Sequence, residues 1–140
     1  MKSRITVITL GVDDLDRAVS FYQEGLGFST DGIVGEEFEN GAVAFFKMNS
    51  GLTFAVFERK NIAHDTQLSQ GAANPTEFTL GHNVESKKEV DQVIEQARKA
   101  GAHITVEPHD AFWGGYSGYF QDPDDHLWEV VWNPDLDINE

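Results

Sequence analysis

Cysteine is absent from the 140-residue chain, and several kinds of site are excluded with it. Without a thiol the chain can form no disulfide, no thiolate metal site and no cysteine nucleophile. Basic residues are also few: 10 Lys and Arg stand against 24 Asp and Glu, which gives a net charge of −14. Binding of nucleic acid or of an anionic membrane requires Lys and Arg to replace counterions. We therefore expect neither partner. The acidic surface either keeps the protein soluble or attracts cationic partners.

Long hydrophobic runs are missing as well. No apolar stretch approaches the roughly 20 residues that a membrane-spanning helix needs. The N-terminal residues 1–4 lead directly into a strand-like run, without the pattern of a signal peptide. We therefore expect a cytoplasmic protein. Hydrophobic residues make up 40% and charged residues 24%, an ordinary composition for a folded chain with a hydrophobic core.

The first half of the chain carries the pattern of one helix among four strands. Residues 5–12 alternate in the manner of a β-strand and are rich in β-branched side chains. Asp14 is expected to cap a helix over residues 14–25, whose apolar side chains recur at helical spacing and which glycines terminate. Three more strands, separated by turn sequences, are predicted at 32–38, 42–48 and 52–58.

The same order then begins again after a polar segment without periodicity, residues 61–75, which we interpret as a linker. Ser86 and Glu89 form a capping box that opens a predicted helix over 86–100. The strands predicted around this helix are 76–84, 102–107, 116–121 and 127–132.

The repeated order predicts an α+β fold of two βαβββ modules. The first module would span about residues 4–60 and the second about 76–134, within one domain over 1–140. Neither module could bury its sheet alone. We expect two curled mixed sheets with helices on their outer faces, surrounding an inner cleft where a ligand binds.

Three segments have a recognisable signature: LGVDDLDRAVSFY at 10–22, GLGF at 25–28 and YFQDPDDHLWE at 119–129. They resemble the vicinal-oxygen-chelate superfamily, which includes glyoxalase I, bleomycin-resistance proteins, fosfomycin-resistance enzymes and extradiol dioxygenases. The resemblance implies the glyoxalase/bleomycin-resistance/dioxygenase fold. It implies less about function, because this fold serves isomerases, transferases, dioxygenases and simple binders. Asp125 stands where the family turn usually has Gly, and Asp tolerates the left-handed conformation.

The resemblance also implies where a metal would bind. The family's metal enzymes place one inward ligand on the first and last strand of each module, and the matching positions are Val7, Ala55, Thr79 and Glu129. Of these only Glu129 is a good donor, and a shift of two residues would replace Thr79 by Glu77. Two carboxylates without an imidazole are a weak set for a borderline divalent ion. We therefore predict no complete metal site and no cofactor.

The histidines do not supply the missing ligands. None shows H-x-x-x-H or another ligand spacing, so surface or structural roles are expected for His64, His82, His103, His109 and His126. His82 alternates with Leu80 and Val84, and is expected to face the helix layer.

Glu129 is the main candidate for chemistry. It lies in an apolar run and shares a strand face with Leu127 and Val131. A carboxylate there is costly to bury unless it is paired or protonated. Two interpretations stay open: Glu129 is a general base or ligand anchor in the cleft, or it is an acid held by a structural partner at the rim.

Aromatic residues are the other candidates for a site. The segment 112–116 contains two glycines beside large aromatics, which suits either a loop over a ligand mouth or a packed hairpin connection. The ligand-binding residues that we predict are Phe46, Phe57, Thr79, Trp113 and Tyr116.

Three classes of function remain open from the sequence. The first is a metal-independent protein that binds a small amphiphilic or cationic molecule. The second is a lactoylglutathione-lyase-like or dioxygenase-like enzyme for a small carbonyl or aromatic substrate, with Glu129 as base or metal ligand, and it would need a Lewis acid. The third is a metal-free lyase or isomerase in which Tyr or His donors assist Glu129. The resemblance, together with open sheet edges, also predicts a homodimer whose modules complete each cleft.

Overall fold

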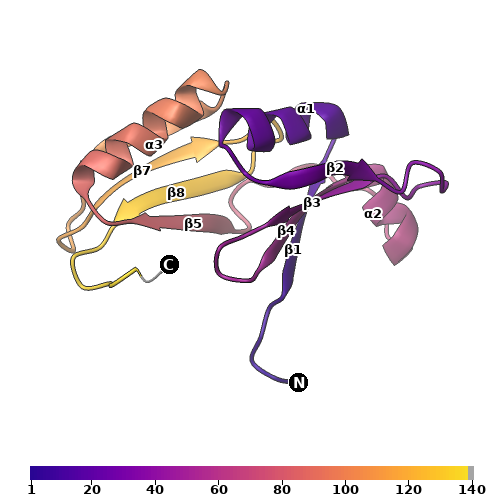
Figure 1. Ribbon diagram of the computed structural model, residues 1–140, viewed down its shortest axis with the longest axis horizontal. Helices are drawn as coiled ribbons and strands as arrows, with labels where there is room; N and C mark the ends of the chain where they lie inside the picture. The colour runs from indigo at the N-terminus through magenta and orange to yellow at the C-terminus, as the bar shows by residue number, and fades with distance from the viewer. Residues whose placement is uncertain (139–140) are drawn as a thin grey trace. The chain divides into compact units, whose positions relative to one another are not determined.

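The computed structural model describes residues 1–138, which fold into two compact units (Figure 1). The first unit is Met1–Ala72, and the second begins at Ala73. The boundary between them lies inside the segment 61–75 that the sequence predicted as a linker. That the two units act as one domain stays a prediction.

The first unit contains one sheet of four strands in the order β1-β4-β3-β2. Strand β1 pairs in parallel with β4, and the other pairs are antiparallel. Its elements in chain order are β1 (Val7–Val12), α1 (Leu15–Ser20), the π-helical η1 (Phe21–Gly25), β2 (Thr30–Val34), β3 (Val43–Lys47), β4 (Thr53–Glu58) and α2 (Arg59–Thr66).

The second unit repeats this plan in a sheet of order β5-β8-β7-β6. Strand β5 is parallel to β8, and the remaining pairs are antiparallel. Its elements are β5 (Thr79–Val84), α3 (Lys87–Lys99), β6 (His103–Asp110), β7 (Tyr116–Gln121) and β8 (Leu127–Trp132). The two βαβββ modules are thus confirmed. From the sequence we expected curled sheets, but the sheets in the structure are not strongly curled.

Both predicted helices are confirmed, with their caps. The Asp14 carboxylate accepts a hydrogen bond from the Arg17 backbone N–H at 3.0 Å, and α1 with η1 fills the range 15–25. The Ser86 hydroxyl accepts from the Glu89 N–H at 3.2 Å, while the Glu89 carboxylate accepts from the N–H of Glu85. These contacts satisfy amide groups that the first turn of a helix leaves unpaired.

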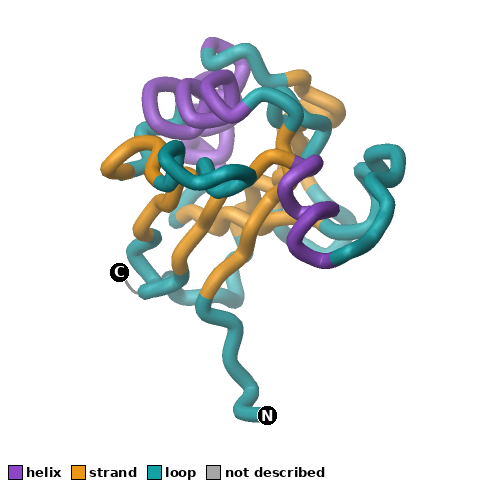
Figure 2. The backbone as a smooth tube through the Cα atoms, turned by 90° about the vertical axis from the view of Figure 1, so that its right-hand side faces the viewer, coloured by secondary structure: helices purple, strands orange, loops and turns teal. Residues whose placement is uncertain are grey.

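Two local predictions are wrong. The second strand was expected at 32–38 but is Thr30–Val34, because Gly35 adopts a φ of +81° and the Phe38 N–H closes a turn onto its carbonyl. The start of the predicted linker is helical: α2 follows β4 directly, and a long loop comes after it (Figure 2). The buried residue of α2 is Asn61, with only 3% of its surface exposed, and a search for apolar periodicity overlooks a polar residue.

Each sheet has one face buried against its own helix. In the first unit, Tyr22 of η1 packs on Phe46 and Phe54, with ring centroids 6.0 Å and 4.8 Å away. In the second, Phe120 and Trp128 stack at 6.0 Å, and α3 buries an apolar stripe of Val90, Ile94 and Ala97. No helix among residues 1–138 is long and apolar enough to cross a membrane.

Candidate functional site

The face of the second sheet that carries Glu129 lies opposite the buried Trp128 and Val130. Strand pairing fixes its neighbours, because residues in register on adjacent strands share a face. Glu129 of β8 lies between Gly81 of β5 and Tyr119 of β7. The rows on either side are Thr79, Leu127 and Gln121, and Asn83, Val131 and Ser117. We call these nine positions the Glu129 face.

Exposure falls along this face from one end to the other. Thr79 and Gly81 are exposed, and Glu129, Leu127 and Tyr119 are half-buried. At the far end Val131 is only 7% exposed and Ser117 only 6%. Glu129 therefore lies between the solvent-exposed end and the buried end of this face, with apolar side chains on either side of it along its own strand. In such a partly buried setting the electrostatic interaction of a carboxylate with a charged ligand is stronger than in bulk water.

Glu129 has a partner that the sequence analysis missed. Tyr119 is directly across from it, and burial raises the pKa of the Tyr119 hydroxyl, as do a hydrogen bond to Glu129 and the carboxylate's charge. Tyr119 thus stays protonated and donates to the carboxylate. The signal was present in the alternation of β7, which puts Tyr119 on one face and Tyr116 and Phe120 on the other.

The structure separates the predicted ligand-binding residues. Phe46 is fully buried in the aromatic core of the first unit, on the helix side of its sheet. Phe57 is half-buried on the opposite, open face of that sheet. Trp113 is 44% exposed, and its ring covers Gly115 in the loop between β6 and β7. Only Thr79 shares a face with Glu129.

Tyr116 lies on the helix side of the second sheet, opposite the Glu129 face. Its hydroxyl donates to the Asp91 carboxylate of α3 at 2.7 Å. This hydrogen bond, followed by burial and the charges of Asp91 and Asp110, raises the pKa of Tyr116 to about 12. The Lys87 ammonium lies 5.6 Å from the Tyr116 ring centre and donates to Asp110 at 2.6 Å. These contacts attach α3 to the sheet.

The residues at the family's metal positions do not fit a divalent ion. Val7 and Ala55 lie on the open face of the first sheet and have no donor atom in their side chains. Thr79 and Glu129 offer one hydroxyl and one carboxylate, and Tyr119 already hydrogen-bonds that carboxylate. Glu77, the alternative donor, accepts a hydrogen bond from the Asn74 side chain at 2.6 Å. Within the described part of either unit, no three His, Asp or Glu side chains are grouped to hold a metal.

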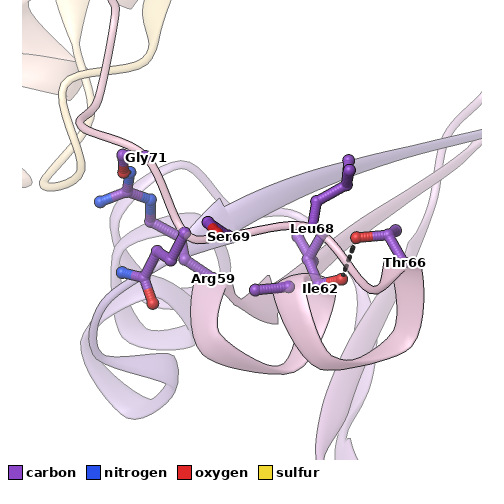
Figure 3. Close-up of a pocket in the computed structure, with 8 residues that line it drawn as sticks. Arg59, Ile62, Thr66, Leu68, Ser69 and Gly71 are labelled. Atoms are coloured by element: carbon purple, nitrogen blue, oxygen red, sulfur yellow. Dashed lines mark hydrogen bonds between the residues drawn. The ribbon is translucent and has the colours of Figure 1, made fainter.

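A separate pocket lies in the first unit, beside α2 and the loop that follows it. It has a volume of about 190 Å³, and Figure 3 shows its lining. Arg59 is its charged residue, and its guanidinium contacts Asp13 at 3.4 Å and donates to the carbonyl of Gly71. The other lining residues are Ile62, Ala63, Thr66, Leu68, Ser69, Gln70 and Gly71. None of the predicted site residues lines this pocket.

The profile of the Glyoxalase/Bleomycin resistance protein/Dioxygenase superfamily matches residues 4–130. The crystal structure of a glyoxalase-related enzyme from Fulvimarina pelagi is 32% identical, with a TM-score of 0.84 over 98% of this chain and 93% of that one. A hypothetical protein from S. aureus is 24% identical, with a TM-score of 0.78 over 95% of each chain.

A putative lactoylglutathione lyase from Brassica oleracea var. gemmifera is 25% identical over 135 residues. That similarity covers 93% of this chain but 44% of the plant protein. Together with the two βαβββ modules, these similarities establish the class. The chain belongs to the glyoxalase/bleomycin-resistance/dioxygenase superfamily, also called the vicinal-oxygen-chelate superfamily.

Proposed function

We propose that this protein binds a small amphiphilic cation on the Glu129 face, without a complete metal site. The observation that carries the proposal is the setting of Glu129, a half-buried carboxylate with Tyr119 as its neighbour across the strand pair. The nine positions of the face contain no Lys or Arg, so a cation from outside would supply the countercharge.

The neighbours of Glu129 give the ligand its second property. Leu127 and Val131 lie on either side of it along β8, and the Tyr119 ring lies across the strand pair. An apolar group bound there would remove hydrocarbon surface from water, which is favourable by about 25 cal/mol per Å². The net charge of −14 would also concentrate cations near the protein. A cationic head with a short apolar body satisfies both requirements.

Glu129→Gln tests the proposal with benzylammonium as the probe. The substitution keeps the shape and removes the charge, so affinity should fall about 10- to 150-fold, the equivalent of 1.5–3 kcal/mol for a bond to a charged group. The melting temperature should hardly change, because an incompletely paired carboxylate carries its own desolvation cost. Calorimetric titration measures the affinity, and benzyl alcohol serves as the uncharged comparison.

Glu37→Gln is the matched control, since it removes one carboxylate from an exposed turn of the first unit. Its affinity for the probe should equal that of the parent. Equal binding of the probe to the parent and to Glu129→Gln, or a large loss of stability with unchanged affinity, would make Glu129 a structural acid and end the proposal.

A second candidate function is catalysis, and the Glu129–Tyr119 pair favours it. A carboxylate beside a protonated phenol combines a general base with a hydrogen-bond donor, as a metal-free lyase or isomerase would require. The putative lactoylglutathione lyase from Brassica suggests lactoylglutathione as the first substrate to try. If the parent forms product and Glu129→Gln does not, catalysis is favoured over simple binding. A dioxygenase-like reaction on an aromatic substrate would instead require added metal.

We also propose that the chain forms a homodimer. Supporting this, Val7 and Phe45 on the open face of the first sheet are 48% and 46% exposed, an apolar exposure that a partner would cover. Light scattering at micromolar concentration should give twice the chain mass of 15.6 kDa. A single-chain mass would refute the dimer and leave the ligand proposal intact.

A further inference from the structure

Gly81 lies in the middle of β5, where its lack of a side chain has no structural explanation. Its φ is not in the left-handed region, and a Cβ atom built on it would meet nothing within 4 Å. Gly118 of β7 differs, because there a Cβ atom would lie 3.0 Å from the Val106 carbonyl oxygen. A glycine inside a strand weakens it, and often marks a point where a ligand approaches the backbone. Neither conformation nor packing requires glycine at position 81.

The empty position adjoins Glu129. Gly81 and Glu129 are in register on neighbouring parallel strands, which are about 4.8 Å apart. On the other side of Glu129, Tyr119 occupies the equivalent place and donates to the carboxylate. A carboxylate has about four acceptor sites, so one phenol leaves most of them available. The accessible side of Glu129 is therefore the side over Gly81.

We propose that Gly81 is a specificity-determining position, and that the ligand's cationic head sits over its bare backbone against the Glu129 carboxylate. The inference rests on the proposed function and deepens it. Tyr119 acts as a positioning residue that holds the carboxylate from the other side. A compact ammonium or guanidinium group fits this place, because any side chain larger than hydrogen at position 81 would compete for the same space. Ligand binding thus requires glycine at position 81, although the strand itself would tolerate a larger side chain there.

The absence of cysteine from the chain allows a test that needs no ligand. Gly81→Cys introduces a single thiol, whose reaction rate with a cationic and an anionic methanethiosulfonate reagent is measured. Taking the ratio of the two rates cancels any effect of the thiol's own ionisation. One carboxylate about 6 Å from the thiol attracts the cationic reagent and repels the anionic one. Its Coulomb energy with each reagent in water should therefore raise the ratio of the cationic rate to the anionic rate about tenfold.

Gly71→Cys is the matched control. Gly71 is also exposed, has no left-handed φ, and would place a Cβ atom near nothing within 4 Å. The Arg59 guanidinium donates to the Gly71 carbonyl, so this rate ratio reports the overall negative charge together with one nearby cation. We expect a higher ratio at position 81 than at position 71, and a fall of about tenfold at position 81 when Glu129→Gln is added. A thiol at 81 that reacts with neither reagent, or a ratio at 81 that Glu129→Gln leaves unchanged, would overturn the inference.

Gly81→Val then tests occupancy by the probe. Valine favours strands, so the melting temperature should stay the same or rise. Affinity for benzylammonium should fall at least tenfold, with Gly81→Ala in between. If Gly81→Val binds like the parent while Glu129→Gln does not, the inference fails and the proposed function stands. If the parent does not bind the probe, or Glu129→Gln binds it equally well, the function fails and the inference falls with it.

Discussion

The two sheets share one topology, but their open faces differ in polarity. In the first unit, three strands contribute a largely apolar surface that includes Val7, Val43, Phe45 and Phe57, with the buried Ala55 among them. In the second unit, the equivalent strands contribute Ser, Thr, Asn, Gln and Tyr side chains around Glu129. The helix-covered faces are alike, because both must be apolar to pack. Packing therefore imposes the same apolar character on the buried face of both modules. The open face is not constrained in this way, so its residues can serve a function.

A pair of glycines in edge strands sharpens the same contrast. Gly11 of β1 lies under α2, where an added Cβ atom would come 2.7 Å from the Arg59 side chain. Gly81 of β5 has nothing above it within 4 Å. Close packing of α2 accounts for the first glycine, whereas no contact of the described residues accounts for the second. In the first unit α2 packs into the space beside the glycine, whereas in the second unit the corresponding space stays open next to the Glu129 carboxylate.

The largest effect that we predict distinguishes the two faces of the first sheet. Phe46 is fully buried among aromatic rings, so Phe46→Ala should lower the free energy of unfolding by about 3–5 kcal/mol. Phe57, half-buried on the open face, should cost less than half as much when replaced by Ala. Urea unfolding of both variants measures the difference. Equal losses would show that the open face of this sheet is packed as tightly as its core.

A smaller effect distinguishes the two faces of the second sheet through its tyrosines. A hydrogen bond to Asp91 is the largest cause of the raised pKa of Tyr116, whereas burial is the largest cause for Tyr119. Asp91→Asn should therefore lower the pKa of Tyr116 markedly, and Glu129→Gln should lower that of Tyr119 only in part. Absorbance titration of the phenolates, with Tyr116→Phe and Tyr119→Phe to assign them, measures both. A larger shift in Glu129→Gln would reverse this order of causes.

The same raised pKa has a consequence for stability at alkaline pH. In the unfolded chain Tyr116 titrates near 10.0, and in the folded protein at about 12. The folded state thus holds the proton more tightly, so its contribution is complete below pH 10 and is lost as pH rises toward 12. Tyr116→Phe should unfold with a shallower dependence on pH between 10 and 12. An unchanged slope in thermal melts across this range would show that the hydrogen bond to Asp91 does not form in solution.

Local signals predicted most of the fold. Asp14 and Ser86 marked where α1 and α3 begin, because capping depends on a few adjacent residues. The last strand was predicted at 127–132 and is Leu127–Trp132. Asp125 has a φ of +68°, the left-handed conformation expected of a residue that replaces Gly in this turn. By contrast, α2 was missed because its periodicity is weak and its buried residue, Asn61, is polar.

The candidate site was predicted less well, and the reason is geometric. The alternation of side chains along β8 correctly placed Glu129 opposite Trp128, since that pattern is a property of one strand. Which residues lie beside Glu129 depends on the register between strands that are distant in the sequence. Tyr119 and Gly81 became its neighbours only through the pairing of β7 and β5 with β8. For the same reason Phe46 and Tyr116, chosen for their aromatic character, proved to lie on the helix-covered faces of their sheets.

The sequence by itself thus determined the order of the elements, their caps, the faces of each strand and the presence of one good metal donor, Glu129, among the four family positions. These follow from local sterics, hydrogen bonding and side-chain chemistry, which act over a few residues. Only the tertiary structure decided which faces are covered, that Tyr119 donates to Glu129, and that the space over Gly81 is empty. Those features depend on long-range strand pairing and on the volume of neighbouring side chains, which no local pattern encodes.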